Sequence, residues 1–496
     1  MEKNPSPLLD SPRSSPGRLA QALADLLPSG CREVRVVQAL EPELVSELKA
    51  LKIEIQQIDS HREDLTASPS PLSWIGSKIS PLDASRLRAL SPDGGRLAIL
   101  WWRRDDLPKD GTDRRRALLE AGFALRAQGE DQELRWLDAR AIAFTLRTAE
   151  ARDENEILDL FQRSFHHRRS SAQWRWLYLD NPVENPRAPQ SRSDKAPRHI
   201  SLAFDKEELV AHYAGFPMCF VDARDPNAPR RLIALQVGDT MTAQRVRSVG
   251  RGPTSVLSRC ARHFYASFSE QQVAFNYGVN EGNIQRFTLR YLSGQKVRDL
   301  TYWQLDLAAG HRPSVHWAHQ HQHEHQPRRR LRQIHDVREL DERFDRLFSQ
   351  LAPSLGIAVE RSAERLRWRY FQRPGFQYHL YAAFEDEELM GWCVLRRDGH
   401  RLLWGDALLP PRGFRWVVTG ALNQALQDGL GDGADYLAGW FSAHQPPGLG
   451  SWLTQLGFLR QPEPQDLGWI CLGFEEPDAP QLLRDAYLTL GDSDLF

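Results

Sequence analysis

An arginine and two glycines stand between a strand-like run and a helix-like run, in a pattern that could hold an anion. The segment reads Arg247-Ser-Val-Gly250-Arg-Gly252; it follows apolar residues 232–237 and precedes the helix-like residues 255–268. Glycine lets the backbone approach a ligand without a Cβ atom in the way. The start of a helix presents unpaired N–H groups and a positive dipole end. The segment therefore predicts a nest of amides suited to a pyrophosphate.

The elements that must position this loop occur twice. Three segments of the chain match later segments in the same order, which indicates a tandem duplication. Residues 174–182 match 366–374 through shared Arg, Trp, Tyr and Pro, residues 203–209 match 383–389, and Gly238-Asp239 matches Gly405-Asp406.

Each copy is predicted to hold a hairpin, then a strand, a helix, a strand and a further helix. The hairpins are expected at residues 200–204 with 209–213 and at 378–384 with 389–395, because apolar runs flank a charged turn. Helices are expected at 255–268 and 416–427, and strands at 272–277 and 435–440. Antiparallel hairpins followed by strand–helix–strand predict a mixed α/β sheet with a parallel pair.

The chain before residue 145 is different. Strand-like runs at 34–37, 52–58 and 96–101 alternate with helix-like runs at 43–51, 84–90 and 114–121, which favours a small parallel α/β unit. Gly-Gly-Arg-Leu-Ala-Ile with Leu-Leu-Glu-Ala-Gly-Phe beyond it resembles the C-terminal half of Rossmann-type S-adenosylmethionine methyltransferases. The glycine loop that would hold the cofactor is missing after Val37. We interpret this unit as a degenerate, Rossmann-like relative or an unrelated α/β domain.

The composition is that of a cytoplasmic protein. Its 64 Lys and Arg balance 65 Asp and Glu, which gives no case for DNA or an anionic membrane as partner. No run of about 18 apolar residues predicts a membrane span. The cysteines lack a Cys-x-x-Cys pair, which favours reduced thiols over disulfides or zinc; they are Cys31, Cys219, Cys260, Cys393 and Cys471. Residues 311–330 hold six histidines that could bind a transition metal, but no carboxylate or Cys set accompanies them. We interpret them as a linker and expect no metal.

These patterns divide the 496 residues into five parts, giving an α/β protein with two similar domains after a small first one. The parts are a disordered 1–17, an α/β domain at 18–145, a domain with the glycine loop at 146–310, a linker at 311–335 and a second copy at 336–496.

Together the two copies resemble a tandem pair of GNAT (GCN5-related) N-acyltransferase domains, of a long bacterial group linked with surface-polysaccharide or lipid-linked sugar pathways. The resemblance includes the Trp-Arg-Trp-x-Tyr segment, Asp239-Thr-Met, the glycine loop, Tyr277-Gly-x-Asn280 and the closing Gly-Asp-Ser-Asp-x-Phe496. It implies acetyl-CoA or another acyl-CoA as co-substrate, an amine such as an amino sugar as acceptor, and direct attack without a covalent enzyme intermediate. It also implies a pantetheine arm that lies between two splayed parallel strands, whose N–H groups polarise the thioester.

The resemblance assigns residues to these roles. Cofactor contacts are expected from Thr240, Met241, Arg247, Ser248, Val249, Gly250, Arg251, Gly252, Thr254, Asn280 and Asn283. Asp239 is the first candidate for the base that removes the amine's proton, although Asp406 persists in the second copy and leaves a structural role equally open. Tyr291 is the candidate acid, one residue later than the family's Tyr, which position 290 replaces with Arg; Tyr277 is the second option. Trp174, Trp176 and Tyr178 are expected to pack in a core or between copies.

The second copy reads Leu409-Pro-Pro-Arg-Gly-Phe-Arg415 where the loop should be. Proline has no N–H to donate, so we expect this copy not to bind acyl-CoA. Two other readings stay open. One is an aminoacyl-tRNA-dependent peptidoglycan transferase, which shares the double architecture. The other is a non-catalytic scaffold protein of a biosynthetic cluster. For the protein itself, a homodimer or a complex with biosynthetic enzymes stays open as its assembly.

Overall fold

The computed structural model of the chain describes residues 144–184, 199–250, 252–307, 328–441 and 446–496, the strands found between residues 33 and 141, and two single positions, 46 and 49. Two compact units make up the chain. One comprises residues 1–147, 202–211 and 242–260, and the other 148–201, 212–241 and 261–496. The predicted disordered segment, the helix-like runs before residue 145, Cys31, Arg251 and the histidines of the linker lie outside the described residues.

The strands before residue 145 form two small sheets. β1 and β2 pair in parallel, as do β3 and β4, in line with the alternation of the sequence. β6 runs antiparallel to both β4 and β5, giving the order β3-β4-β6-β5. The antiparallel pair departs from the purely parallel unit that we predicted, because β5 and β6 follow each other closely enough to pair as a hairpin. The methyltransferase resemblance stays a prediction. The bounds are β1 Glu33–Val36, β2 Glu54–Gln57, β3 Trp74–Gly76, β4 Leu97–Arg103, β5 Phe123–Glu130 and β6 Leu134–Ala141.

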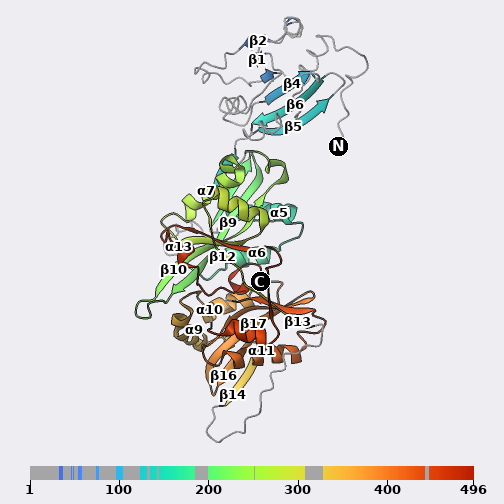
Figure 1. Cartoon of the computed structure of the whole chain (residues 1–496). Helices are drawn as coiled ribbons and strands as arrows, with labels where there is room; N and C mark the ends of the chain where they lie inside the picture. Colours follow the sequence, from blue (N-terminus) through green and yellow to red (C-terminus); the bar gives the residue numbers. More distant parts are fainter. Residues whose placement is uncertain are drawn as a thin grey trace. The chain divides into compact units, whose positions relative to one another are not determined.

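The rest of the chain builds two larger sheets with the same plan (Figure 1). The first has the order β7-β8-β9-β10-β11-β21-β12, with β15 also paired to β9, and the second has the order β14-β16-β17-β18-β19-β13-β20. Strands of the first sheet are β7 Phe144–Thr148, β8 Ile200–Asp205, β9 Glu208–Asp222, β10 Arg230–Thr242, β11 Phe275–Asn280, β12 Gln295–Asp299, β15 Ile357–Val359 and β21 Gly468–Gly473. Strands of the second are β13 Tyr302–Asp306, β14 Arg329–Ile334, β16 His379–Glu385, β17 Glu388–Asp398, β18 Arg401–Leu408, β19 Tyr436–Trp440 and β20 Leu459–Gln461.

Helices complete the two copies. The α-helices are α5 Glu154–Phe165, α6 Ser171–Tyr178, α7 Val256–Phe268, α8 Gly282–Tyr291, α9 Glu342–Leu355, α10 Ala363–Leu366, α11 Phe414–Gln427, α12 Leu449–Gln455 and α13 Ala479–Leu482. Short 3₁₀ turns lie at Ala151–Asp153, Gln244–Val246, Gly252–Thr254, Val337–Glu339 and Leu490–Asp492, and a π-helical turn at Arg367–Phe371. Elements predicted from the sequence at both copies are present, which confirms a mixed α/β fold built from a duplicated pattern.

The duplication extends to local geometry. The hairpin turns between β8 and β9 and between β16 and β17 each carry a non-glycine residue with positive φ, Lys206 at 58° and Asp386 at 52°. The Trp-rich segments form α6 and the π-helical turn after α10. The start of α6 is fixed by a capping box in which Ser170 and Gln173 bond to each other's backbone N–H. Trp174, Trp176 and Tyr178 are buried, which confirms their predicted packing role.

The two copies exchange one strand each. β13 follows β12 in the chain but pairs with β19 and β20 of the second sheet. β21 follows β20 but pairs with β11 and β12 of the first sheet. The exchange crosses the boundary that the sequence predicts between 310 and 336. Each sheet is therefore completed by a strand from the other copy.

Candidate functional site

The parallel strands β10 and β11 part in the middle of the first sheet. They pair only from Ala234↔Phe275 to Gln236↔Tyr277, although β10 continues to Thr242 and β11 to Asn280. Beyond this point the facing backbone groups of the two strands do not bond to each other. Such an opening offers amide and carbonyl groups to an extended ligand in the way that a neighbouring strand would.

A groove lies over this opening, and we call it the strand groove. Its walls are aromatic and aliphatic with a few polar groups, as is usual for small-molecule sites. The lining residues are Tyr213, Val237, Thr240, Tyr265, Asn276, Tyr277, Gly278, Asn280, Ile284, Thr288, Ile470, Cys471 and Leu472. They come from β9, β10, α7, β11, α8 and the exchanged strand β21.

The structure brings part of the predicted site together here. Thr240, Tyr277 and Asn280 line the groove, and Met241 is buried beside Thr240 in the chain. Two predicted residues of α8 do not line it. Asn283 is exposed and accepts a hydrogen bond from Arg286 at 2.7 Å, and the half-buried ring of Tyr291 packs 5.4 Å from Phe287.

Tyr277 is a fully buried hydrogen-bond donor. Its hydroxyl lies 3.2 Å from Gln236 Oε1 and 3.0 Å from the carbonyl oxygen of Asp492. Burial raises the pKa of Tyr277 well above its ordinary value. A phenol held in this way keeps its proton at neutral pH, and it orients the amide of Gln236.

Asp239 lies at the parting of the strands with φ of 50°. Its carboxylate accepts hydrogen bonds from Tyr178, at 2.8 Å, and from Arg169, with which it forms an ion pair. Only 7% of the carboxylate side chain is exposed. Both partners reach the same oxygen, Oδ2, and the ion pair with the guanidinium holds the carboxylate in place. This arrangement favours a positioning role for Asp239.

His212 is linked to the same cluster. Its Nδ1 lies 2.8 Å from the carbonyl oxygen of Asp239, so Nδ1 carries the proton and Nε2 is the unprotonated nitrogen. Nε2 has no hydrogen-bond partner among the described residues. Burial lowers the pKa of His212 from 6.5 to about 4. The imidazole is therefore neutral throughout the physiological range.

The predicted anion loop lies in the other compact unit. Gly250 and Gly252 have φ of 72° and 54°, and a Cβ at Gly250 would come within 2.5 Å of the carbonyl oxygen of Thr254. Both hydroxyls of Ser255 and Ser258 donate to the carbonyl of Gly252, at 2.8 and 2.6 Å. The glycines are thus required by the shape of the loop, which leads through a 3₁₀ turn into α7.

The other residues of the loop differ in their exposure and contacts. Arg247 is exposed and donates from Nε to the carbonyl of Thr242 at 3.0 Å. Ser248 is exposed and Val249 is buried. Thr254 belongs to the 3₁₀ turn before α7, and Arg251 lies outside the described residues.

Sequence reasoning missed two contributions to the site. The exchanged strand supplies Ile470, Cys471 and Leu472 to the groove; nothing local in a sequence indicates which sheet a short apolar run will join. The second is Asp494, whose Oδ1 accepts a hydrogen bond from Gln236 Nε2 at 2.9 Å. The closing Gly-Asp-Ser-Asp-x-Phe segment was the signal that could have drawn attention to it.

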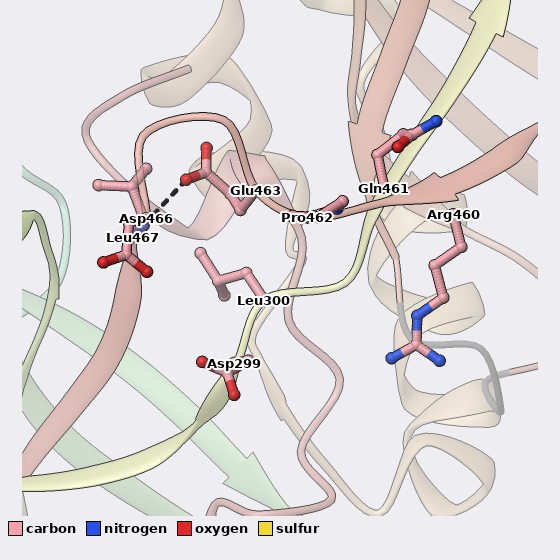
Figure 2. A pocket seen from close by; sticks show the side chains of 8 residues that line it. All are labelled: Asp299, Leu300, Arg460, Gln461, Pro462, Glu463, Asp466 and Leu467. Atoms are coloured by element: carbon pink, nitrogen blue, oxygen red, sulfur yellow. Dashed lines mark hydrogen bonds between the residues drawn. The ribbon is translucent and has the colours of Figure 1, made fainter.

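A second cavity, of about 390 Å³, is lined by residues at the connections from β12 to β13 and from β20 to β21 (Figure 2). Leu300 lies in its middle, with Asp299, Glu463 and Asp466 to one side and Arg460 to the other. Glu463 accepts a hydrogen bond from the backbone N–H of Leu467 at 2.9 Å and so fixes its own loop. Its lining has neither glycine-rich backbone nor a basic cluster, so it does not suit a pyrophosphate.

Metal-binding clusters and membrane-crossing helices are absent from the described residues. None of their groups of His, Cys, Asp and Glu is arranged to hold a metal ion. None of the helices in the same residues is long and apolar enough to cross a membrane.

No family model matches the chain, and no curated protein matches it. Among solved structures it is similar to a probable N-acyltransferase from Enterococcus faecalis, with 12% identity, 69% of this chain and 74% of that chain covered, and a TM-score of 0.47. A GCN5-related N-acetyltransferase from Kribbella flavida shares 13% identity over 68% of this chain and 73% of its own, with a TM-score of 0.45. A tandem GNAT protein from the clavulanic acid biosynthesis pathway has 12% sequence identity to this chain, with 67% of this chain and 98% of that chain covered and a TM-score of 0.39. At such identities and TM-scores no activity is carried over from these proteins to this chain.

Proposed function

We propose that the chain transfers an acetyl or longer acyl group from acyl-CoA to an amine, by direct attack of the amine on the thioester. The observation that carries this proposal is the parting of β10 and β11 after Gln236 and Tyr277, over a groove that is mostly apolar. A pantetheine arm, with two amides in an extended chain, could bond to the unpaired strand edges. The N–H groups there would also stabilise the negative charge that develops on the thioester oxygen.

The loop from Arg247 to Gly252 is our candidate for the pyrophosphate, because it follows directly after β10 in the chain. Its support is the pair of positive-φ glycines and the start of α7. Within it, Ser248, Val249, Gly250 and Arg251 would contribute backbone amides, and Thr254 a hydroxyl. Thr240, Met241 and Asn280 would contact the pantetheine arm, and Asn283 would contact an outer part of the same ligand.

Direct attack is favoured over a covalent enzyme intermediate. Cys471 is the cysteine that lines the strand groove, and burial raises its pKa well above the ordinary value. A thiol that is not ionised is a poor nucleophile. The proposed reaction therefore joins the amine and the acyl group in one ternary complex, with an amino sugar or a surface-polysaccharide precursor as our candidate acceptor.

The second copy is proposed not to bind acyl-CoA. β18 and β19 also pair over only three residues, ending at Leu403↔Ala438. The next residue is Trp404, which occupies the position that Val237 has in the first copy and is 1% exposed. Its ring packs 4.1 Å from that of Phe441. An indole fills the space that remains open in the first copy.

Calorimetric titration of acetyl-CoA tests the proposal. The wild-type chain should bind one equivalent, and Gly250→Glu should bind none, because the side chain brings bulk and negative charge to the loop. Arg247→Glu, which adds negative charge without the steric conflict at Gly250, should weaken binding. Arg412→Glu is the matched control in the corresponding turn of the second copy, and it should leave binding unchanged. Absence of binding to the wild-type chain would refute acyl-CoA transfer, and two equivalents would refute the inactive second copy.

A further inference from the structure

The C-terminal segment contacts the same point of both copies. Gly238 and Gly405 are equivalent residues of the duplication, each directly before an aspartate. A Cβ at Gly238 would lie 3.1 Å from Oδ2 of Asp494. A Cβ at Gly405 would lie 2.0 Å from the ring of Phe496. The missing side chain thus leaves room for the carboxylate of Asp494 at Gly238 and for the ring of Phe496 at Gly405.

Asp494 faces the place where the strands part. Gln236 is the last residue of β10 that pairs with β11, and its amide donates to Oδ1 of Asp494. Gly238, the position against Oδ2, is the second residue beyond the pairing. The side-chain hydrogen bond from Gln236 reaches Oδ1 and leaves Oδ2 on the side of Gly238. Asp494 is half-buried, unlike the fully buried Asp492.

The groups around Asp494 set its protonation behaviour. Burial is the first cause that raises its pKa, and the negative charge of Asp239 is the second. The guanidinium groups of Arg169 and Arg373 act in the opposite direction. A carboxylate whose pKa is moved toward neutrality is a better proton acceptor than an ordinary aspartate. Asp239 differs in its contacts, because Oδ2 forms an ion pair with Arg169 and accepts a hydrogen bond from Tyr178.

Resting on the acyl transfer proposed above, we propose that Asp494, carried by the C-terminal segment, is the residue that accepts the proton of the attacking amine. The chain Tyr277–Gln236–Asp494 holds the carboxylate in place. Asp239, fixed by Arg169 and Tyr178, is then a positioning residue that shapes the end of β10.

The proposed acyl transfer conserves atoms and charge. Oδ2 of Asp494 takes one proton from the bound ammonium, and the freed nitrogen lone pair forms a bond to the thioester carbon. The second nitrogen-bound proton leaves the tetrahedral adduct as the C–S bond breaks, and the thiolate sulfur takes up a proton to leave as CoA thiol. Asp494 returns its own proton to water, so the products are the amide, the thiol and one proton.

The second copy lacks this arrangement. Phe496 lies against Gly405 there, and Asp406 is fully buried among Arg361, Tyr370 and Thr489. The proposed proton acceptor therefore belongs to the first copy.

The test measures release of CoA thiol from acetyl-CoA with methylamine, a small amine that can enter an acceptor site of any shape. Asp494→Asn should keep acetyl-CoA affinity within about threefold and lower the rate about 10²- to 10⁴-fold. The rate of the wild-type chain should fall at acid pH as the carboxylate is protonated, and the variant should lose this limb. Asp494→Glu should recover part of the rate. Asp485→Asn, an exposed residue of the same segment of chain, is the matched control and should behave as wild type.

The outcomes separate the two proposals. A wild-type chain that does not bind acetyl-CoA removes the acyl transfer itself, and the role of Asp494 falls with it. An Asp494→Asn variant with an unchanged rate or an unchanged acid limb overturns the assignment of Asp494 alone. Binding of acetyl-CoA by the wild-type chain without thiol release from methylamine overturns both proposals, because no amine is then acylated. An Asp494→Asn variant with lower acetyl-CoA affinity and lower thermal stability, whose rate still falls at acid pH, would show that Asp494 has only a structural role.

Discussion

Trp176 and Trp368 bond to each other reciprocally. Nε1 of Trp176 donates to the carbonyl oxygen of Trp368 at 2.8 Å, and Nε1 of Trp368 donates to that of Trp176 at 3.0 Å. Their rings stack with centroids 4.7 Å apart. The two positions are equivalent in the duplication. An exchange of the same bond between equivalent residues is the signature of an isologous contact, so the copies associate about an approximate two-fold axis.

Replacing either tryptophan should strongly destabilise the protein. Trp176→Ala removes a buried indole and leaves the carbonyl of Trp368 without its donor, and should cost about 3–5 kcal/mol in the free energy of unfolding. Trp368→Ala should cost a similar amount. Urea denaturation of both variants and of the double variant should give a coupling energy of about 0.5–3 kcal/mol. Additive losses would contradict the reciprocal contact, and the half-buried Trp416→Ala is the control.

Gly405→Ala should destabilise the second copy because its Cβ would collide with the ring of Phe496. We expect a loss of about 1–3 kcal/mol, which is typical of overpacking. In thermal unfolding, the double variant Gly405→Ala/Phe496→Leu should lose less stability than the sum of the losses measured for the two single variants. Gly238→Ala is the matched control: its neighbour is the end of an aspartate side chain at 3.1 Å, so its loss should be smaller. Equal losses at the two glycines would argue against this packing.

Asp406 neutralises a guanidinium that has no access to solvent. Arg361 donates to Asp406 at 3.0 Å and to Asp492 at 2.8 Å, and all three side chains are at most 1% exposed. Asp406→Asn should cost about 3–5 kcal/mol, because it leaves part of a buried charge uncompensated. Denaturation in urea at neutral pH measures the loss. The half-buried Asp336→Asn, which breaks a pair with the exposed Arg338, should leave the midpoint unchanged.

His212 should make the protein sensitive to acid. Its pKa in the folded state, about 4, is below the ordinary 6.5, so the unfolded chain binds more protons between these values. The stability that this creates is fully present above pH 6.5 and is lost as pH falls toward 4, by about 3 kcal/mol in all. His212→Gln should flatten the dependence of unfolding free energy on pH in this window. An unchanged slope would contradict burial of a neutral imidazole, and the exposed His335→Gln serves as control.

Much of the fold could be predicted from the sequence because both copies contain the same local sequence patterns. Apolar runs on either side of a charged turn predicted the hairpins of β8 with β9 and β16 with β17, and the parallel pair β10 with β11 followed from the intervening helix. Strand ends differed, since β9 extends to Asp222 where the expected strand ended at residue 213. Pairing with β15 gives its later residues a partner, and that partner lies far along the chain.

The candidate site was harder to predict for a physical reason. Thr240, Tyr277 and Asn280 belong to strands next to the parting, and the family resemblance of two short segments, Asp239-Thr-Met and Tyr277-Gly-x-Asn280, was enough to indicate them. Asp494 is distant in sequence and reaches β10 only through tertiary packing. Tyr291 was expected from its spacing on α8, yet its ring turns toward Phe287; a shift of one residue rotates a helical side chain by about 100° around the axis.

The exchange of β13 and β21 has a consequence for synthesis on the ribosome. The first sheet cannot close when its own copy has been translated, since β21 begins at Gly468 and β12 ends at Asp299. At about 5–20 residues per second the free edges of β11 and β12 wait roughly 10–30 s for their partner. During that interval the nascent chain exposes strand edges that invite wrong pairings. Dependence on chaperones should therefore be greatest for ribosome-bound intermediates that end between these two strands.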